Sequence, residues 1–298
     1  MRRPVATAAG AVAAVGAACF GWGLLEARLF TVREARLPLL PQGSQDLRVL
    51  HLSDVHLLSR QATKLEFLRS LADLAPDLVV NTGDNISEAG AVYPLMQALA
   101  GLRGVPGVFV FGSNDYYAPK FKNPVCYLLD GRSHMAAAPP VELPWRDLRD
   151  RLEGYGWVDL TGHRATLEVD GLRISFRGTD DAHLEKDDYA LVGGPADETA
   201  DLNIGVTHAP YARILDAMAA DGMDLIFAGH THGGQVCVPG YGALITNCDL
   251  DTARVKGLSR HGAAHLHVSG GLGTSPFAPY RFANRPEITL LTLTARSA

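Results

Sequence analysis

The sequence is poor in cysteine and carries no excess of positive charge. Of its four cysteines, Cys19 lies in an apolar segment and no two are spaced as CxxC. The other three, Cys126, Cys237 and Cys248, are an odd number, so neither a disulfide framework nor a zinc knuckle is indicated. The 27 basic and 32 acidic residues give a net charge of −5, which disfavours a general nucleic-acid binder.

Charge is also absent from residues 4–25, a run of 22 residues that follows Arg2 and Arg3. About 20 apolar residues suffice to cross a bilayer as a helix, and Trp22 suits an interfacial anchor. A cleaved signal peptide is the alternative, although the run is long for its apolar region. We therefore predict that residues 1–29 form a transmembrane anchor or signal segment. The protein is expected to be a single-pass protein of the cell membrane, held through residues 4–25, with the extracytoplasmic side favoured.

From residue 30 onward, short apolar runs alternate with stretches that have the spacing of helices, which predicts an α/β layered domain. Expected strands are Phe30–Leu37, Arg48–Leu52, Leu78–Val80, Gly107–Phe111, Asn203–Val206, Leu225–Phe227, His265–Ser269 and Glu287–Thr294, with a hairpin over Arg164–Ser175 that turns on Asp170-Gly171. Expected helices are Thr63–Ala75, Val92–Leu102, Trp145–Glu153 and Pro210–Ala220. Pro38 is expected to end the first strand. Between residues 116 and 144 the pattern dissolves, which is typical of a lid loop or a surface insertion.

Five of the apolar runs are followed directly by side chains that bind metals. These are Asp54 and His56, then Asp84, then Asn114, then His208, and finally His230 and His232 in the stretch AGHTHGGQ. Ligands of open α/β sheets gather outside the carboxyl ends of the strands. In an extended chain, side chains at i and i+2 point the same way, so each pair is expected to converge. An isolated HxH is as readily a surface turn, but five coincidences argue for one site.

Two aspartates, one amide and four histidines are too many ligands for one tetrahedral zinc. They suit two divalent ions that share a bridging carboxylate, and mixed nitrogen and oxygen shells accept manganese, iron or zinc. Ions about 3.5–4 Å apart clamp the attacking and leaving oxygens of a phosphoryl displacement and lower the pKa of a bridging water. The composition of the set therefore favours phosphoryl chemistry.

The ordered motifs resemble those of the calcineurin-like metallophosphoesterases over roughly residues 46–295. DxH, GD, VTH and GHTH stand in the family's order. GHTHGGQV and the carboxyl-terminal GLGT…YRFANRPEITLLTL are similar to the membrane-associated bacterial branch. The resemblance implies an α/β fold over residues 30–298, a four-layer αββα sandwich of two mixed β-sheets flanked by helices.

The resemblance also implies a role for each ligand. Asp54, His56 and His232 would hold the first metal. Asp84 would bridge the two metals. Asn114, His208 and His230 would hold the second.

One element departs from the family pattern. The family usually has GNHD, in which the asparagine binds metal and the histidine helps the leaving group depart. Here residues 112–115 read GSND. Either Ser113 takes the ligand position and Asn114 the histidine position, or the turn shifts so that Asn114 binds metal. We favour Asn114, because a neutral hydroxyl is a poor substitute for an amide oxygen. The usual general acid is then missing, and His183 is a candidate to replace it.

Other polar residues have plainer interpretations. His51 lies within a strand and is expected to be a hydrogen-bonded core residue, whereas His267 is expected at a strand edge. Asp181 is either a partner of a metal-bound histidine or part of a turn. Arg281 either meets a phosphate or is simply solvated.

The sequence predicts a dinuclear metal-dependent phosphoesterase that hydrolyses phosphate esters by attack of a metal-bridging hydroxide, with Asp84, Asn114 and His183 as catalytic residues. A short link between the apolar segment and the first strand suggests a membrane-associated substrate. Phosphomonoesters, phosphodiesters and pyrophosphates are all compatible with a two-metal site. The alternative is a phosphoesterase-fold scaffold that binds a protein or lipid partner without turnover.

Overall fold

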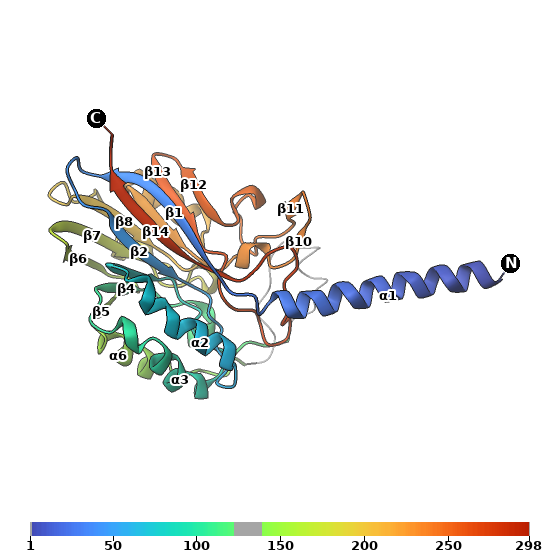
Figure 1. Ribbon diagram of the computed structural model, residues 1–298. Helices are drawn as coiled ribbons and strands as arrows, with labels where there is room; N and C mark the ends of the chain where they lie inside the picture. The colour runs from blue at the N-terminus through green and yellow to red at the C-terminus, as the bar shows by residue number, and fades with distance from the viewer. Residues whose placement is uncertain (1, 122–138, 298) are drawn as a thin grey trace.

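The computed structural model describes residues 2–121 and 139–297. Within them, two six-stranded sheets pack face to face, and helices cover their outer faces (Figure 1). This arrangement confirms the four-layer α/β sandwich of two mixed sheets.

The first sheet has the strand order β1-β14-β2-β3-β4-β5. Its strands are β1 (Thr31–Leu40), β14 (Glu287–Ala295), β2 (Leu47–Leu52), β3 (Leu78–Asn81), β4 (Gly107–Phe109) and β5 (Trp157–Asp159). Strands β2 to β5 are parallel, β14 runs antiparallel to β2, and β1 runs parallel to β14. The carboxyl ends of β2, β3 and β4 therefore meet at one edge of this sheet.

The second sheet has the order β12-β13-β9-β8-β7-β6. Its strands are β12 (Gly257–His261), β13 (Ala264–Val268), β9 (Leu225–Ala228), β8 (Leu202–Val206), β7 (Leu172–Gly178) and β6 (Arg164–Val169). The four central strands are parallel, and the edge strands β12 and β6 are antiparallel to their neighbours. The predicted hairpin is β6–β7, and its turn residues Asp170 and Gly171 have φ of 51° and 80°, as a two-residue turn requires. A small separate ribbon pairs β10 (Cys237–Val238) with β11 (Gly242–Ala243).

Helices bury their apolar faces on the outside of both sheets. Leu65 and Leu68 of α2 are spaced by one helical turn and join the same apolar cluster as the residues of α3 and α6 (Figure 1). On the second sheet, α7 packs through Ile214, Leu215 and Met218. The helices described here are α2 (Ala62–Ser70), α3 (Val92–Ala98), α4 (Ser113–Tyr116), α6 (Trp145–Glu153) and α7 (Ala212–Ala220). Short 3₁₀ turns are Leu71–Leu74, Ala89–Ala91, Ala100–Leu102, Ala182–Leu184, Tyr189–Leu191, His232–Gly234 and Thr252–Arg254.

The main core lies between the two sheets. Val80 and Val108 of the first sheet belong to the same buried cluster as Phe176 and Ile204 of the second. Because the parallel strands are covered on both faces, their sequences are almost continuously apolar. This core fixes the two sheets against each other and so fixes the relative positions of their carboxyl ends.

The prediction that Pro38 ends the first strand is wrong. Strand β1 continues to Leu40 and pairs through Pro38 with Thr294 of β14. Strand β1 is an edge strand, with β14 as its neighbour in the sheet order, so the missing amide hydrogen of a proline can face away from the ladder. The register shifts between Pro38 and Leu40, as is usual where proline interrupts pairing.

The apolar run at the start forms helix α1 (Arg2–Glu26), which extends away from the body (Figure 1). Among the described residues, no helix combines the length and the apolar character that crossing a bilayer requires. The prediction of a single-pass membrane protein held through residues 4–25 is therefore wrong. Of those 22 residues, 12 are alanine or glycine, which give a weaker insertion signal than the leucines of a typical span.

Most of the predicted lid at 116–144 lies outside the described residues. Its two ends are described, and there Tyr117 and Glu142 form an isolated antiparallel bridge.

Candidate metal centre

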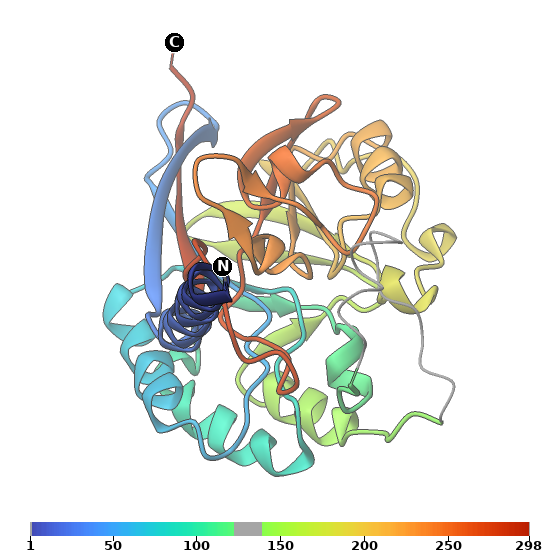
Figure 2. The same cartoon turned by 90° about the vertical axis from the view of Figure 1, so that its right-hand side faces the viewer.

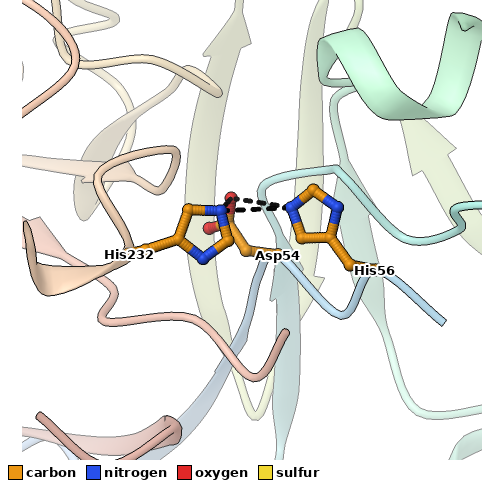
Figure 3. Close-up of side chains that lie close together, drawn as sticks. All are labelled: Asp54, His56 and His232. Carbon is orange, nitrogen blue, oxygen red and sulfur yellow. Dashed lines mark hydrogen bonds and ion pairs between the residues drawn. The ribbon is translucent and has the colours of Figure 1, made fainter. Parts of the chain in front are cut away.

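The predicted ligands meet where the carboxyl ends of β2, β3, β8 and β9 come together. Two groups of three have ligand atoms that all lie within 4.8 Å of one another, namely Asp54, His56 and His232, and Asp54, Asp84 and His208. Figure 3 shows the first group, in which the His56 and His232 rings turn a nitrogen toward each other beside the Asp54 carboxylate. The Nε2 atoms of the two rings are 3.1 Å apart. Residues distant in sequence thus form one buried cluster.

Asp84, a member of the second group, also lies close to a histidine of the first. Its Oδ2 is 3.3 Å from His56 Nε2 and 3.5 Å from His208 Nε2. Burial alone would raise the pKa of Asp84, but His208 and His56 outweigh burial and hold that pKa well below its usual value. This carboxylate is therefore ionised, with an imidazole on each of two different loops beside it.

His208 has the donor arrangement of a metal ligand. Its Nδ1 lies 2.6 Å from the carbonyl oxygen of Thr82, which can only accept, so Nδ1 carries a hydrogen. Its buried Nε2 has no hydrogen-bond partner among the described residues and faces Asp84. In metal sites, the ring nitrogen of a histidine that does not bind the metal commonly donates to a backbone carbonyl, and this hydrogen bond orients the ring. The cluster of buried acids and imidazoles therefore fits divalent ions.

The electrostatics of His208 agree with this fit. Burial lowers the pKa of His208, but Asp84, Asp181 and Asp54 together outweigh burial and raise the pKa well above its ordinary value. The acids therefore attract positive charge to this point. A metal ion that binds here would displace the proton, since histidine ligates in its neutral form.

The third sequence element is GSND at residues 112–115. In it Asn114, rather than Ser113, contacts Asp84. The backbone N–H of Asn114 donates to Asp84 Oδ1 at 2.7 Å, and its side-chain Nδ2 donates to Oδ2 at 2.8 Å. Ser113 Oγ lies 3.5 Å from Asn114 Nδ2. Gly112 makes this approach feasible, because a Cβ there would collide with Asp84 Oδ1.

His230 lies beside the second group. Its backbone N–H donates to Asp54 Oδ2 at 3.0 Å, and its Nε2 is 3.1 Å from Asn247 Nδ2. Its ring centroid is 5.2 Å from that of His208 and 4.6 Å from that of His183. His183, with Nδ1 3.1 Å from the Tyr211 hydroxyl, lines the cavity in front of the cluster.

The prediction that Asp54 and His56, and likewise His230 and His232, converge through an extended chain is wrong. Left-handed φ angles occur at Asp54 (50°), His56 (45°), Asp84 (56°), His230 (69°) and His232 (51°). Such conformations cost roughly 1 kcal/mol or more each for non-glycine residues. The surrounding hydrogen bonds therefore hold the ligands in place against local backbone preference.

Asp115 is one of the residues that hold the ligands in place, although no role was predicted for it. It is fully buried, and its carboxylate accepts from the backbone N–H groups of Asp84 (2.7 Å), Asn85 (2.8 Å) and Gly112 (3.0 Å). Burial and then Asp84 raise the pKa of Asp115 to about 6. The sequence could have indicated this role, because Asp115 lies three residues after Gly112 in the first turn of α4. A carboxylate at that position caps free backbone N–H groups.

Arg281 is a second support, and neither of its predicted interpretations is correct. The guanidinium is fully buried and donates to the carbonyl oxygens of Gly270, Gly271 and Gly273. It also reaches the carbonyl oxygen of His232 at 3.3 Å. Arg281 therefore holds the loop around a candidate ligand and does not face a substrate.

The end of α1 completes this support. Glu26 is buried and accepts from the backbone N–H groups of Ala283 (3.0 Å) and Asn284 (2.7 Å) and from the Trp22 indole (2.8 Å). The Asn284 side chain in turn donates to the carbonyl oxygen of His232 at 2.7 Å. Figure 2 looks along α1 from its outer end, and Figure 1 shows its inner end at the body of the molecule.

A model of the family described as calcineurin-like phosphoesterase matches residues 47–234, a stretch that contains all seven candidate ligands. The chain belongs to the calcineurin-like phosphoesterase family. This membership confirms the resemblance on which the ligand assignment rests.

Similar proteins carry the same family description. The uncharacterized metallophosphoesterase YkuE of Bacillus subtilis is 29% identical, over 97% of this chain and 93% of that protein. A transmembrane protein with metallophosphoesterase domain from Bos taurus is 30% identical, over 89% of this chain and 57% of its own length. Among solved structures, TT1561 of Thermus thermophilus is 12% identical, with a TM-score of 0.42, over 76% of this chain and 91% of that one.

A first prediction separates the two candidate ligands of the third element. Asn114→Ala should lower the amount of the second metal retained, because Asn114 contacts Asp84 directly. Ser113→Ala should retain both metals. Metal content of the purified variants, measured by plasma mass spectrometry, checks this. The reverse order would show that Ser113 holds the ligand position.

A second prediction concerns the support from α1. Glu26→Ala removes the acceptor of two backbone N–H groups next to Asn284, so His232 should be held less firmly. We expect metal affinity to fall by up to about tenfold, measured by competition with a chromophoric chelator.

The matched control is Glu34→Ala, an exposed carboxylate on β1. Glu26→Gln, which keeps one acceptor oxygen, should recover part of the affinity. Wild-type affinity in Glu26→Ala would mean that the helix end does not act on the metal centre.

Proposed function

We propose that this protein hydrolyses phosphate esters at a centre of two divalent ions, taken from manganese, iron or zinc. The observation that carries the proposal is the position of Asp84, whose Oδ2 lies 3.3 Å from His56 Nε2 and 3.5 Å from His208 Nε2. A buried carboxylate between two imidazoles from different strands is the arrangement that a pair of ions requires. Family membership and the donor set of His208 support the same conclusion.

The proposed roles follow the two groups. Asp54, His56 and His232 would hold the first ion, Asn114, His208 and His230 would hold the second, and Asp84 would be shared by both. Two divalent ions in such a shell polarise phosphoryl oxygens and provide a nucleophile from water near neutral pH.

Proton delivery to the leaving group is assigned to His183. The third element has no histidine, and His183 lines the cavity in front of the metal cluster with its ring 4.6 Å from that of His230. Its backbone N–H donates to Asp181 at 2.8 Å, which fixes the turn that carries it. His183 is therefore placed to serve leaving groups that cannot depart as anions.

The competing function is a scaffold that keeps the fold and binds a partner without turnover. A scaffold has no need for buried acids and imidazoles held in left-handed backbone conformations. The retention of that strain at Asp54 and Asp84 favours an enzyme.

A third prediction tests the shared carboxylate. Asp84→Asn should lower turnover of 4-nitrophenyl phosphate esters by roughly 10²-fold or more, because it removes the charge between the two ions. Asp216→Asn is the control, since that carboxylate is 70% exposed on α7. Removal of metal by a chelator should abolish turnover in the wild type, and added Mn²⁺ should restore it. Undiminished turnover in Asp84→Asn would exclude the mechanism.

A fourth prediction tests His183 through the leaving group. His183→Gln should lower kcat/KM about 10²-fold for alkyl phosphate esters, whose leaving groups need a proton. For 4-nitrophenyl esters, which leave as stable anions, the loss should be several times smaller. An equal loss for both kinds of ester would assign His183 a structural role.

A further inference from the structure

The cavity in front of the metal cluster is much larger than a phosphate group needs. It has a volume of about 520 Å³, which is within the range of pockets that enclose a whole small molecule. The candidate ligands His56, Asp84 and His232 form one side of it. A phosphoryl group at the metals would leave most of this volume for the rest of the substrate.

Part of the cavity lining is apolar. Four large apolar side chains that line the cavity are exposed well beyond a core residue, Phe121 at 68%, Phe277 at 51%, Leu244 at 50% and Val236 at 42%. Single exposed apolar residues are common, but several around one cavity mark a ligand-binding surface. The apolar wall is defined here as these four residues.

The apolar wall is built from separate segments that hydrogen bonds hold together. Phe121 follows α4, Val236 and Leu244 flank the β10–β11 ribbon, and Phe277 lies between β13 and β14. Gln235 Nε2 donates to the carbonyl oxygens of Ala278 (2.9 Å) and Tyr280 (3.1 Å) and so joins two of these segments. The rings of Phe121 and Phe277 meet edge to face, with centroids 6.3 Å apart.

Few positively charged side chains are present among the described residues that line this cavity. Among the described lining residues, Lys120 is the one lysine or arginine, and its Nζ donates to the carbonyl oxygen of Pro139 at 2.5 Å. Arg281 lies nearby but is buried and directed at backbone carbonyls. A nucleotide or another polyphosphate would need further cations beyond the metals. The described lining favours a substrate with one phosphoryl group and an uncharged remainder.

We infer that the preferred substrates are phosphate esters with a large apolar organic group, which packs on the apolar wall while the phosphoryl group lies at the metals. This inference rests on the proposed function. The apolar contact acts in binding and needs no residue beyond those of the wall.

Non-hydrolysable phosphonates test the inference without turnover. Binding of methylphosphonate and hexylphosphonate to the Mn²⁺-loaded full-length protein is measured by calorimetry, below the concentration at which hexylphosphonate aggregates. Each methylene group fully buried on the wall should strengthen binding about fourfold. Hexylphosphonate is therefore expected to bind at least about tenfold more tightly than methylphosphonate.

The double variant Phe277→Ser/Leu244→Ser should reduce the ratio of the two affinities to below about threefold. Because both affinities are measured on the same variant, a general loss of metal or fold cancels in the ratio. The control is Tyr93→Ala on α3, an aromatic residue that is 62% exposed and lies outside the cavity lining. It should keep the wild-type ratio.

The outcomes separate the inference from the proposed function. Binding of both phosphonates with a ratio near 1 in the wild type would overturn the apolar substrate class and leave the phosphoesterase intact. A ratio that survives in the double variant would also overturn it. Binding of neither phosphonate to the metal-loaded protein would contradict the proposed function itself.

Discussion

The structure depends on holding two carboxyl groups inside the protein. Asp54 is fully buried and Asp84 is 2% exposed, and an isolated buried carboxylate is costly enough to neutralise itself by taking up a proton. Here Asp84 stays ionised because His56 and His208 approach it and because Asn114 donates to both of its oxygens. Such a cluster is stable only where many groups are fixed in advance.

The two-sheet core provides that fixed arrangement. Parallel strands bring their carboxyl ends to one edge, so each strand delivers its ligand to the same region. The sandwich core, with Val80 facing Phe176 and Ile204 across the interface, sets the distance between the edges of the two sheets. Glycines then allow close approach, as at Gly229, where a Cβ would come within 2.7 Å of Asp54 Oδ2.

The sequence predicted the features that arise from short-range pattern. Continuous apolar runs identified the parallel strands, and the residues after them gave the candidate ligands. The local sequence pattern did not predict features that depend on residues distant in the chain. Pro38 is tolerated because β1 lies at a sheet edge, a fact of topology. His267, expected at a strand edge, is instead buried with its Nδ1 2.8 Å from that of His51. The left-handed φ of His232 is uncommon for a non-glycine residue, and Arg281 and Asn284, both distant in sequence, contact the carbonyl oxygen of that residue.

The first helix shows most clearly how a local interpretation can mislead. Read alone, residues 4–25 are an apolar run, and the residue that ends the helix, Glu26, is an ordinary charged boundary. In the fold, Glu26 is buried against residues more than 250 positions away, and its carboxylate caps the backbone next to Asn284. Asn284 and Arg281 both contact the carbonyl oxygen of His232. Glu26 at the helix end and Arg281 in the facing loop are both buried, so their polar groups need partners. Backbone groups near His232 provide them. The constraint that organises the metal cluster therefore extends to the end of α1, so that this helix end is part of the framework of the site and not merely an appendage to it.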